Sequence, residues 1–111
     1  MHELSICSAI AGIVAEHSGG RPVERVHLDV GALRQVVPDT LRYSWEFTVT
    51  ETPLAGSVLE VREIPAVIRC ADCQASTTIT QPLFRCPCGS TDTTVVTGEE
   101  LLVTSLELCS A

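Results

Sequence analysis

Two stretches of the chain have the apolar periodicity of amphipathic helices. The spacing of apolar residues predicts a helix from about Glu3 to Glu16. Its buried stripe would consist of Ile6, Ile10, Ile13, Val14 and His17. Gly19 and Gly20 should end this helix, because glycine tolerates the left-handed backbone found at helix C-termini. A second helix should begin at Pro38, a residue suited to the first helical turn, with a buried side made of Leu41, Trp45 and Val49.

Three other stretches have the pattern of β-strands. From Val23 to Val30, apolar and polar residues alternate, which predicts a strand with one buried face. Val58 to Ile64 and Leu101 to Leu108 are rich in valine, leucine and isoleucine and are predicted as two more strands. The stretch between these two, about Ala66 to Thr97, has no helical period and is rich in threonine. We therefore predict an α+β fold in which two helices pack on a three-stranded sheet, with this stretch as an insert.

The predicted order of elements is α-β-α-β-insert-β, and it divides the chain into two domains. Residues 1–65 and 98–111 would form the α/β domain, and residues 66–97 would form the inserted domain. The insert has few large apolar residues, so it could not fold on a hydrophobic core alone.

The insert carries four of the six cysteines, in two close pairs: Cys70, Cys73, Cys86 and Cys88. Each pair can supply two thiolates from one tight turn, which predicts a ribbon-like structural zinc site whose metal would provide much of the folding free energy. The second pair is Cys-Pro-Cys, one residue shorter than the usual Cys-x2-Cys, and therefore needs a different turn; Gly89 follows it and permits positive φ. Asp72 or Asp92 could replace a thiolate that fails to reach the metal. Unliganded thiols or two disulfides are the alternatives to zinc.

Composition narrows the possible functions. The 111 residues include 14 acidic and 7 basic ones, a net charge of −7. A chain this acidic lacks the positive electrostatic field that non-specific binding to nucleic acid or anionic membranes requires. No apolar run in the sequence approaches the ~20 residues that a membrane-spanning helix needs. The first residues have no signal-peptide pattern, so we expect a cytoplasmic protein with reduced thiols. Cys7 and Cys109 lie outside the insert and are expected to be buried or incidental.

The amino terminus offers a second set of metal ligands. The Met1 amine, the His2 backbone nitrogen and the His2 imidazole Nδ1 can close two chelate rings around one ion. Planar nitrogen chelation suits Ni(II) or Cu(II) better than Zn(II), because d8 and d9 ions gain from a tetragonal field. Glu3 adds a nearby carboxylate. Taken alone, a histidine at the second position is most often just a solvated residue.

The order of these features resembles that of the hydrogenase/urease nickel-incorporation family, HypA and HybF. The segments that carry the resemblance are Met1–Ser5, Val30–Gly31, Val37–Leu41, the four-cysteine insert and Glu99–Leu108. The family usually has Cys-Pro-x-Cys where this chain has Cys86-Pro87-Cys88.

The resemblance implies a nickel metallochaperone without catalytic turnover. It would bind Ni(II) through Met1 and His2, with Glu3 and Asp39 near the site, and hold structural zinc on the four cysteines of the insert. It would work with the GTPase HypB and deliver nickel to the large-subunit precursor of NiFe-hydrogenase, or in some organisms to urease. A monomer and a homodimer are both compatible with the sequence.

Two other function classes fit the sequence less well. A zinc-ribbon module that binds nucleic acid or a protein surface would need basic and aromatic residues, but Arg69 and Arg85 are the insert's only basic ones. A zinc hydrolase would need an open coordination position and a general base, which four thiolates do not offer.

Overall fold

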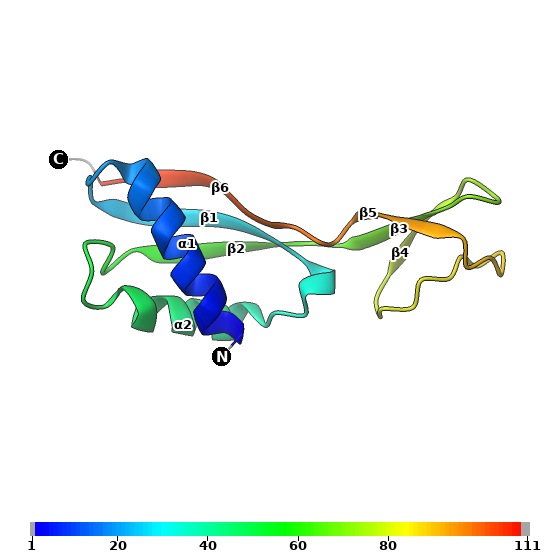
Figure 1. Cartoon of the computed structure of the whole chain (residues 1–111), viewed down its shortest axis with the longest axis horizontal. Coiled ribbons are helices and arrows are strands. Elements are labelled where there is room, and N and C mark those ends of the chain that lie inside the picture. Colours follow the sequence, from blue (N-terminus) through cyan, green and yellow to red (C-terminus); the bar gives the residue numbers. More distant parts are fainter. Residues whose placement is uncertain (1, 110–111) are drawn as a thin grey trace. The chain divides into compact units, whose positions relative to one another are not determined.

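A computed structural model describes the chain from His2 to Cys109 (Figure 1). Its elements are α1 (His2–Ser18), β1 (Val23–Gly31), a 3-10 helix (Ala32–Arg34), α2 (Pro38–Val49), β2 (Val58–Ile64), β3 (Ala66–Cys70), β4 (Ser76–Ile79), β5 (Thr93–Thr97) and β6 (Leu101–Leu108). The predicted α+β class is confirmed, as are both helices and the three strands predicted outside the insert. Among the described residues, no helix is long and apolar enough to cross a membrane.

The described residues form two compact units. The first unit is made of three segments: the described residues up to Asp29, the range Val36–Arg62, and the described residues from Leu102 onward. The second contains Val30–Gln35 and Glu63–Leu101. The second unit is larger than the predicted insert of residues 66–97, because it begins at Glu63, ends at Leu101 and also includes Val30–Gln35. Whether residues 66–97 form a separate domain stays a prediction.

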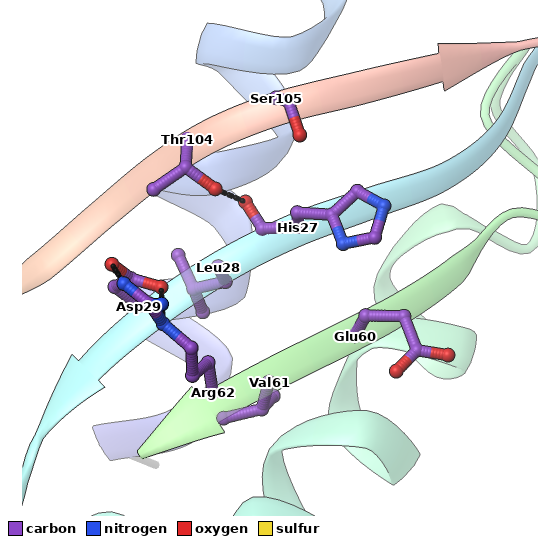
Figure 2. A pocket seen from close by; sticks show the side chains of 8 residues that line it. All are labelled: His27, Leu28, Asp29, Glu60, Val61, Arg62, Thr104 and Ser105. Carbon is purple, nitrogen blue, oxygen red and sulfur yellow. Dashed lines mark hydrogen bonds and ion pairs between the residues drawn. The ribbon is translucent and has the colours of Figure 1, made fainter. Parts of the chain in front are cut away.

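The first unit packs two helices on a three-stranded sheet with the strand order β2-β1-β6. Figure 2 shows β1 and β2 running in the same direction and β6 in the opposite one, with the helices behind the sheet. A parallel pair of neighbouring strands needs a crossover connection, and α2 provides it. The helices also pack against each other. The fully buried large side chains of this core are Val14, Val26, Leu28, Leu41, Trp45, Val49 and Leu59.

The buried stripe of α1 differs from the predicted one in two places. Ile6, Ile10 and Val14 are buried as expected, but Ile13 is 46% exposed. His17 is exposed, and its Nδ1 lies 3.1 Å from the carbonyl oxygen of Ile13 within the same helix. The buried residues of α1 are Ile6, Cys7, Ile10, Val14 and Ser18, so the buried stripe advances mainly in steps of four and Ile13 falls on its margin.

The second unit contains an antiparallel sheet with the strand order β4-β3-β5. Ile68 of β3 lies opposite Thr77 of β4 and Val95 of β5. Few of its side chains are buried: in residues 66–97, the buried apolar ones are Ala66, Ile68, Cys70 and Cys86. The sequence did not predict these three strands, because β4 and β5 are rich in threonine and only the five-residue β3 has buried positions.

Candidate metal centre

The first cysteine pair lies in the turn that joins β3 to β4. The Cys70 N–H donates to the carbonyl oxygen of Ala75 at 2.9 Å, and the Gln74 N–H donates back to Cys70 at 3.0 Å. Gln74 has φ of 66°, a left-handed conformation that closes the turn. The Cys73 N–H points to the Cys70 sulfur at 3.5 Å. This turn therefore holds both sulfurs on one side of the chain.

The shorter pair, Cys86-Pro87-Cys88, is held by a turn that uses the following residues. The Gly89 N–H donates to the carbonyl oxygen of Cys86 at 2.8 Å, and the Cys86 N–H donates to that of Ser90 at 3.0 Å. Gly89 has φ of 99°, as the sequence led us to expect. The two turns are joined by a 2.9 Å hydrogen bond from the Ala71 N–H to the carbonyl oxygen of Asp92.

The four sulfurs converge despite the missing residue in the second pair. All four lie within 4.8 Å of one another, with Cys70 3.7 Å from Cys88 and Cys73 3.5 Å from Cys86. Tetrahedral Zn²⁺ with Zn–S bonds of ~2.3 Å would place the sulfurs about 3.8 Å apart. The cluster is therefore compatible with zinc, and the four cysteines are free thiols rather than disulfides.

The proposed oxygen alternatives are not part of this cluster. The carboxylate of Asp72 accepts a hydrogen bond from the Ser90 hydroxyl, and the group of potential metal ligands found among the described side chains contains only the four cysteines. The site has no open position in its ligand set, which is typical of structural zinc and not of catalytic zinc.

The surroundings of Cys70 and Cys86 shift the pKa values of these two thiols in opposite directions. The Cys73 backbone N–H lowers the pKa of Cys70 to about 7, with help from the Asp72 N–H and the neighbouring sulfurs. The Cys88 backbone N–H lowers the pKa of Cys86, but burial and the other three sulfurs outweigh it and raise that pKa to about 12. A bound dication would deprotonate all four thiols, because a coordinating thiol loses its proton outright.

The predicted nickel ligands lie mainly outside the described side chains. Nothing is described of Met1 or of the His2 side chain, and α1 begins at His2. Glu3 is half-buried in the first turn of α1. Asp39 lies in the first turn of α2, where its carboxylate is 93% exposed and pairs with Arg42 at 2.6 Å. No described contact joins Glu3 to Asp39.

The open face of the first unit's sheet carries a polar hollow of about 410 Å³ that the sequence did not reveal. Figure 2 shows Asp29 and Arg62 pointing toward each other on β1 and β2, in a bidentate pair at 3.0 and 2.8 Å. His27 bonds to Glu107, whose pKa is lowered mainly by this hydrogen bond. These polar groups bond to one another, and among the described side chains they form no group of potential metal ligands. Only knowledge of the strand order could have revealed the Asp29–Arg62 pair.

Comparison with known proteins places the whole chain in one family. Residues 1–108 match the model of the family described as "Hydrogenase/urease nickel incorporation, metallochaperone, hypA". The hydrogenase maturation factor HypA of Nostoc sp. strain PCC 7120 is 39% identical over 108 residues, covering 97% of this chain and 96% of the relative. That of Chloroflexus aurantiacus is 45% identical over 112 residues, covering 96% and 98%.

A solved structure has the same fold. The solution structure of the Ni metallochaperone HypA from Helicobacter pylori matches with a TM-score of 0.70 at 21% identity, and the match covers 100% of both chains. The fold, the four-cysteine cluster and the match along the whole chain lead to one conclusion: this chain belongs to the HypA family of metallochaperones for hydrogenase and urease nickel incorporation.

Proposed function

We propose that this chain binds Ni(II) through the Met1 amine, the His2 backbone nitrogen and the His2 imidazole, with Glu3 and Asp39 nearby. It transfers the ion, without catalytic turnover, to the large-subunit precursor of a NiFe-hydrogenase or to urease. The GTPase HypB assists this transfer in the cytoplasm. The observation that carries the proposal is that α1 begins at His2 in a chain matched along its length by a nickel-incorporation family.

The start of α1 favours nickel chelation for a specific reason. The first four N–H groups of a helix have no acceptor within the helix. The His2 nitrogen can therefore lose its proton and bind Ni(II) without breaking a helical hydrogen bond. The Glu3 carboxylate in the first turn lies at the positive end of the helix dipole and offsets the charge of the incoming cation.

We further propose that Cys70, Cys73, Cys86 and Cys88 hold a structural zinc ion. Residues 66–97 would then be a zinc-folded domain, and the rest of the chain would be the nickel-binding domain. The separation of the sulfurs and the closed ligand set support this assignment. Zinc supplies folding free energy here, and a closed thiolate site retains its metal while the open amine and imidazole site can release nickel to a recipient.

Acetylation of the Met1 amine tests the nickel site most directly. The acetyl group removes the free amine from the ligand set and adds no nitrogen donor, so we expect Ni(II) binding measured by isothermal titration calorimetry to be lost. The zinc content, measured by metal analysis of the same protein, should not change. Unchanged nickel affinity in the acetylated chain would refute the site.

Two histidine substitutions provide a matched comparison. His2→Ala should lower nickel affinity by at least about tenfold, whereas His17→Ala should leave it within about twofold, because His17 lies at the other end of α1. Asp39→Asn should have a smaller effect than His2→Ala, since Asp39 is already paired with Arg42. Equal losses for the two histidines would mean that nickel binds elsewhere.

A further inference from the structure

Two large aromatic side chains on α2 face solvent. Tyr43 is 73% exposed and Phe47 is 71% exposed, the highest values among the exposed large hydrophobic side chains of the described residues. They belong to the same helix as Leu41, Trp45 and Val49, which are at most 1% exposed. The helix therefore has a complete buried side and a second, unpartnered aromatic side.

Tyr43 and Phe47 form one continuous surface because they lie at i and i+4 on the helix. With their exposed neighbours they form a stripe, which we call the aromatic stripe: Asp39, Thr40, Tyr43, Glu46, Phe47 and Thr50. Folding gains nothing from aromatic rings left in water, and aromatic side chains of this kind dominate the binding energy of many protein interfaces.

The charges around the aromatic rings are acidic. Asp39 pairs with Arg42, but Glu46 and the exposed Glu51, which lies in the turn just after the helix, have no ion-pair partner among the described residues. Two other arginines of the first unit, Arg25 and Arg62, are engaged with carboxylates on the strands. A complementary surface would therefore present apolar groups surrounded by lysine or arginine.

A second copy of the chain is a poor occupant for this surface. A two-fold interface pairs one patch with itself, so Glu46 and Glu51 of one copy would face the same acidic groups of the other. Like charges brought together at an interface cost binding free energy. The charge pattern thus favours a different protein over self-association.

The stripe lies on a helix that packs against the amino-terminal half of α1. The Cys7 sulfur of α1 donates to the carbonyl oxygen of Leu41 of α2 at 3.5 Å. We propose that the aromatic stripe docks a protein partner that presents an apolar pocket ringed by basic side chains, close to the end of α1. A role of the docked partner in nickel transfer rests on the proposed function. The docking surface itself does not depend on that function.

The test uses two purified probes, the HypB-type GTPase and the hydrogenase large-subunit precursor of the same organism. We compare their affinities for the wild-type chain and for the Tyr43→Ala/Phe47→Ala variant by isothermal titration calorimetry. Binding of at least one probe should weaken by tenfold or more in the variant. Leu102→Ala is the matched control, since Leu102 is 57% exposed on β6, and it should change affinity by less than about twofold.

A second variant tests the charge complementarity and does not depend on removing apolar area. Glu46→Gln/Glu51→Gln should weaken the same complex a few-fold and flatten its dependence on salt, because rim charges act mainly through long-range attraction. Both variants should keep the wild-type thermal unfolding midpoint, since these side chains are exposed.

Three results would overturn the proposal. They are wild-type affinity in the aromatic variant, failure of the wild-type chain to bind either probe, and a wild-type dimer in light scattering that the aromatic variant abolishes. Nickel titration of the same proteins separates the two proposals. A chain that docks through the stripe but binds no nickel would refute the proposed function and leave the docking surface supported.

Discussion

Cys7 and Cys109 lie outside the four-cysteine cluster, and their surroundings differ. Cys7 is completely buried on α1, and burial, with a smaller contribution from the charge of Glu3, raises the pKa of its thiol to about 11. Cys109 is half-exposed after β6. Since the thiolate is the reactive form, we expect iodoacetamide at pH 8 to alkylate Cys109 at least about tenfold faster than Cys7. Peptide mass spectrometry of the zinc-loaded protein measures both rates, and equal rates would contradict the burial of Cys7.

At the scale of the elements, Gly31 at the end of β1 shows how closely two backbones approach. A Cβ at Gly31 would lie 2.0 Å from the carbonyl oxygen of Gly98, next to the 2.7 Å hydrogen bond from Gly31 to Glu100. Gly31→Ala should therefore lower the free energy of unfolding by about 2 kcal/mol or more, measured by urea denaturation. Gly12→Ala is the control, because its Cβ meets nothing within 4 Å; it should stabilise α1 by ~0.5–1 kcal/mol. If both substitutions changed the free energy of unfolding equally, the backbones at Gly31 and Gly98 could not lie as close as the structure places them.

The elements that the sequence predicted well are those with a buried side in the first unit. Trp45 and Leu28 lie at positions whose period matches their element, so α2 and β1 follow from the spacing alone. Ile13 fits the helical period and is nonetheless exposed, because periodicity cannot tell where the neighbouring elements stop covering a helix. The strands of the insert gave no signal, since β4 and β5 alternate half-buried and exposed positions without a buried one.

At the scale of the whole molecule, the two proposed metal sites differed in how far the sequence could define them. Ligand type and spacing were enough to propose the four cysteines as one site, but not to show how the shortened pair reaches it. That depends on the turn from Cys86 to Ser90 and on the bond between Ala71 and Asp92, which are contacts between distant segments. The proposed nickel chelate is defined by the types of the first two residues alone, and the fold adds only that α1 begins at His2.

Loss of zinc should affect the two units differently, because they depend on different sources of stability. The first unit has a core of large apolar side chains, whereas two of the four buried apolar residues in residues 66–97 are proposed zinc ligands, Cys70 and Cys86. Removing the metal leaves the second unit with almost no core and with buried thiols that lack a partner. Its amide resonances should then collapse to unfolded shifts, while those of α1 and α2 persist.

Two-dimensional NMR before and after chelation, with metal analysis of each sample, measures this directly. Cys88→Ser should reproduce the effect of chelation, because it removes one of the four thiolates. Cys109→Ser should not, since Cys109 lies outside the cluster. Unchanged spectra for residues 66–97 after confirmed zinc loss would show that the metal does not fold this segment. Collapse of α1 and α2 as well would show that the two units fold as one.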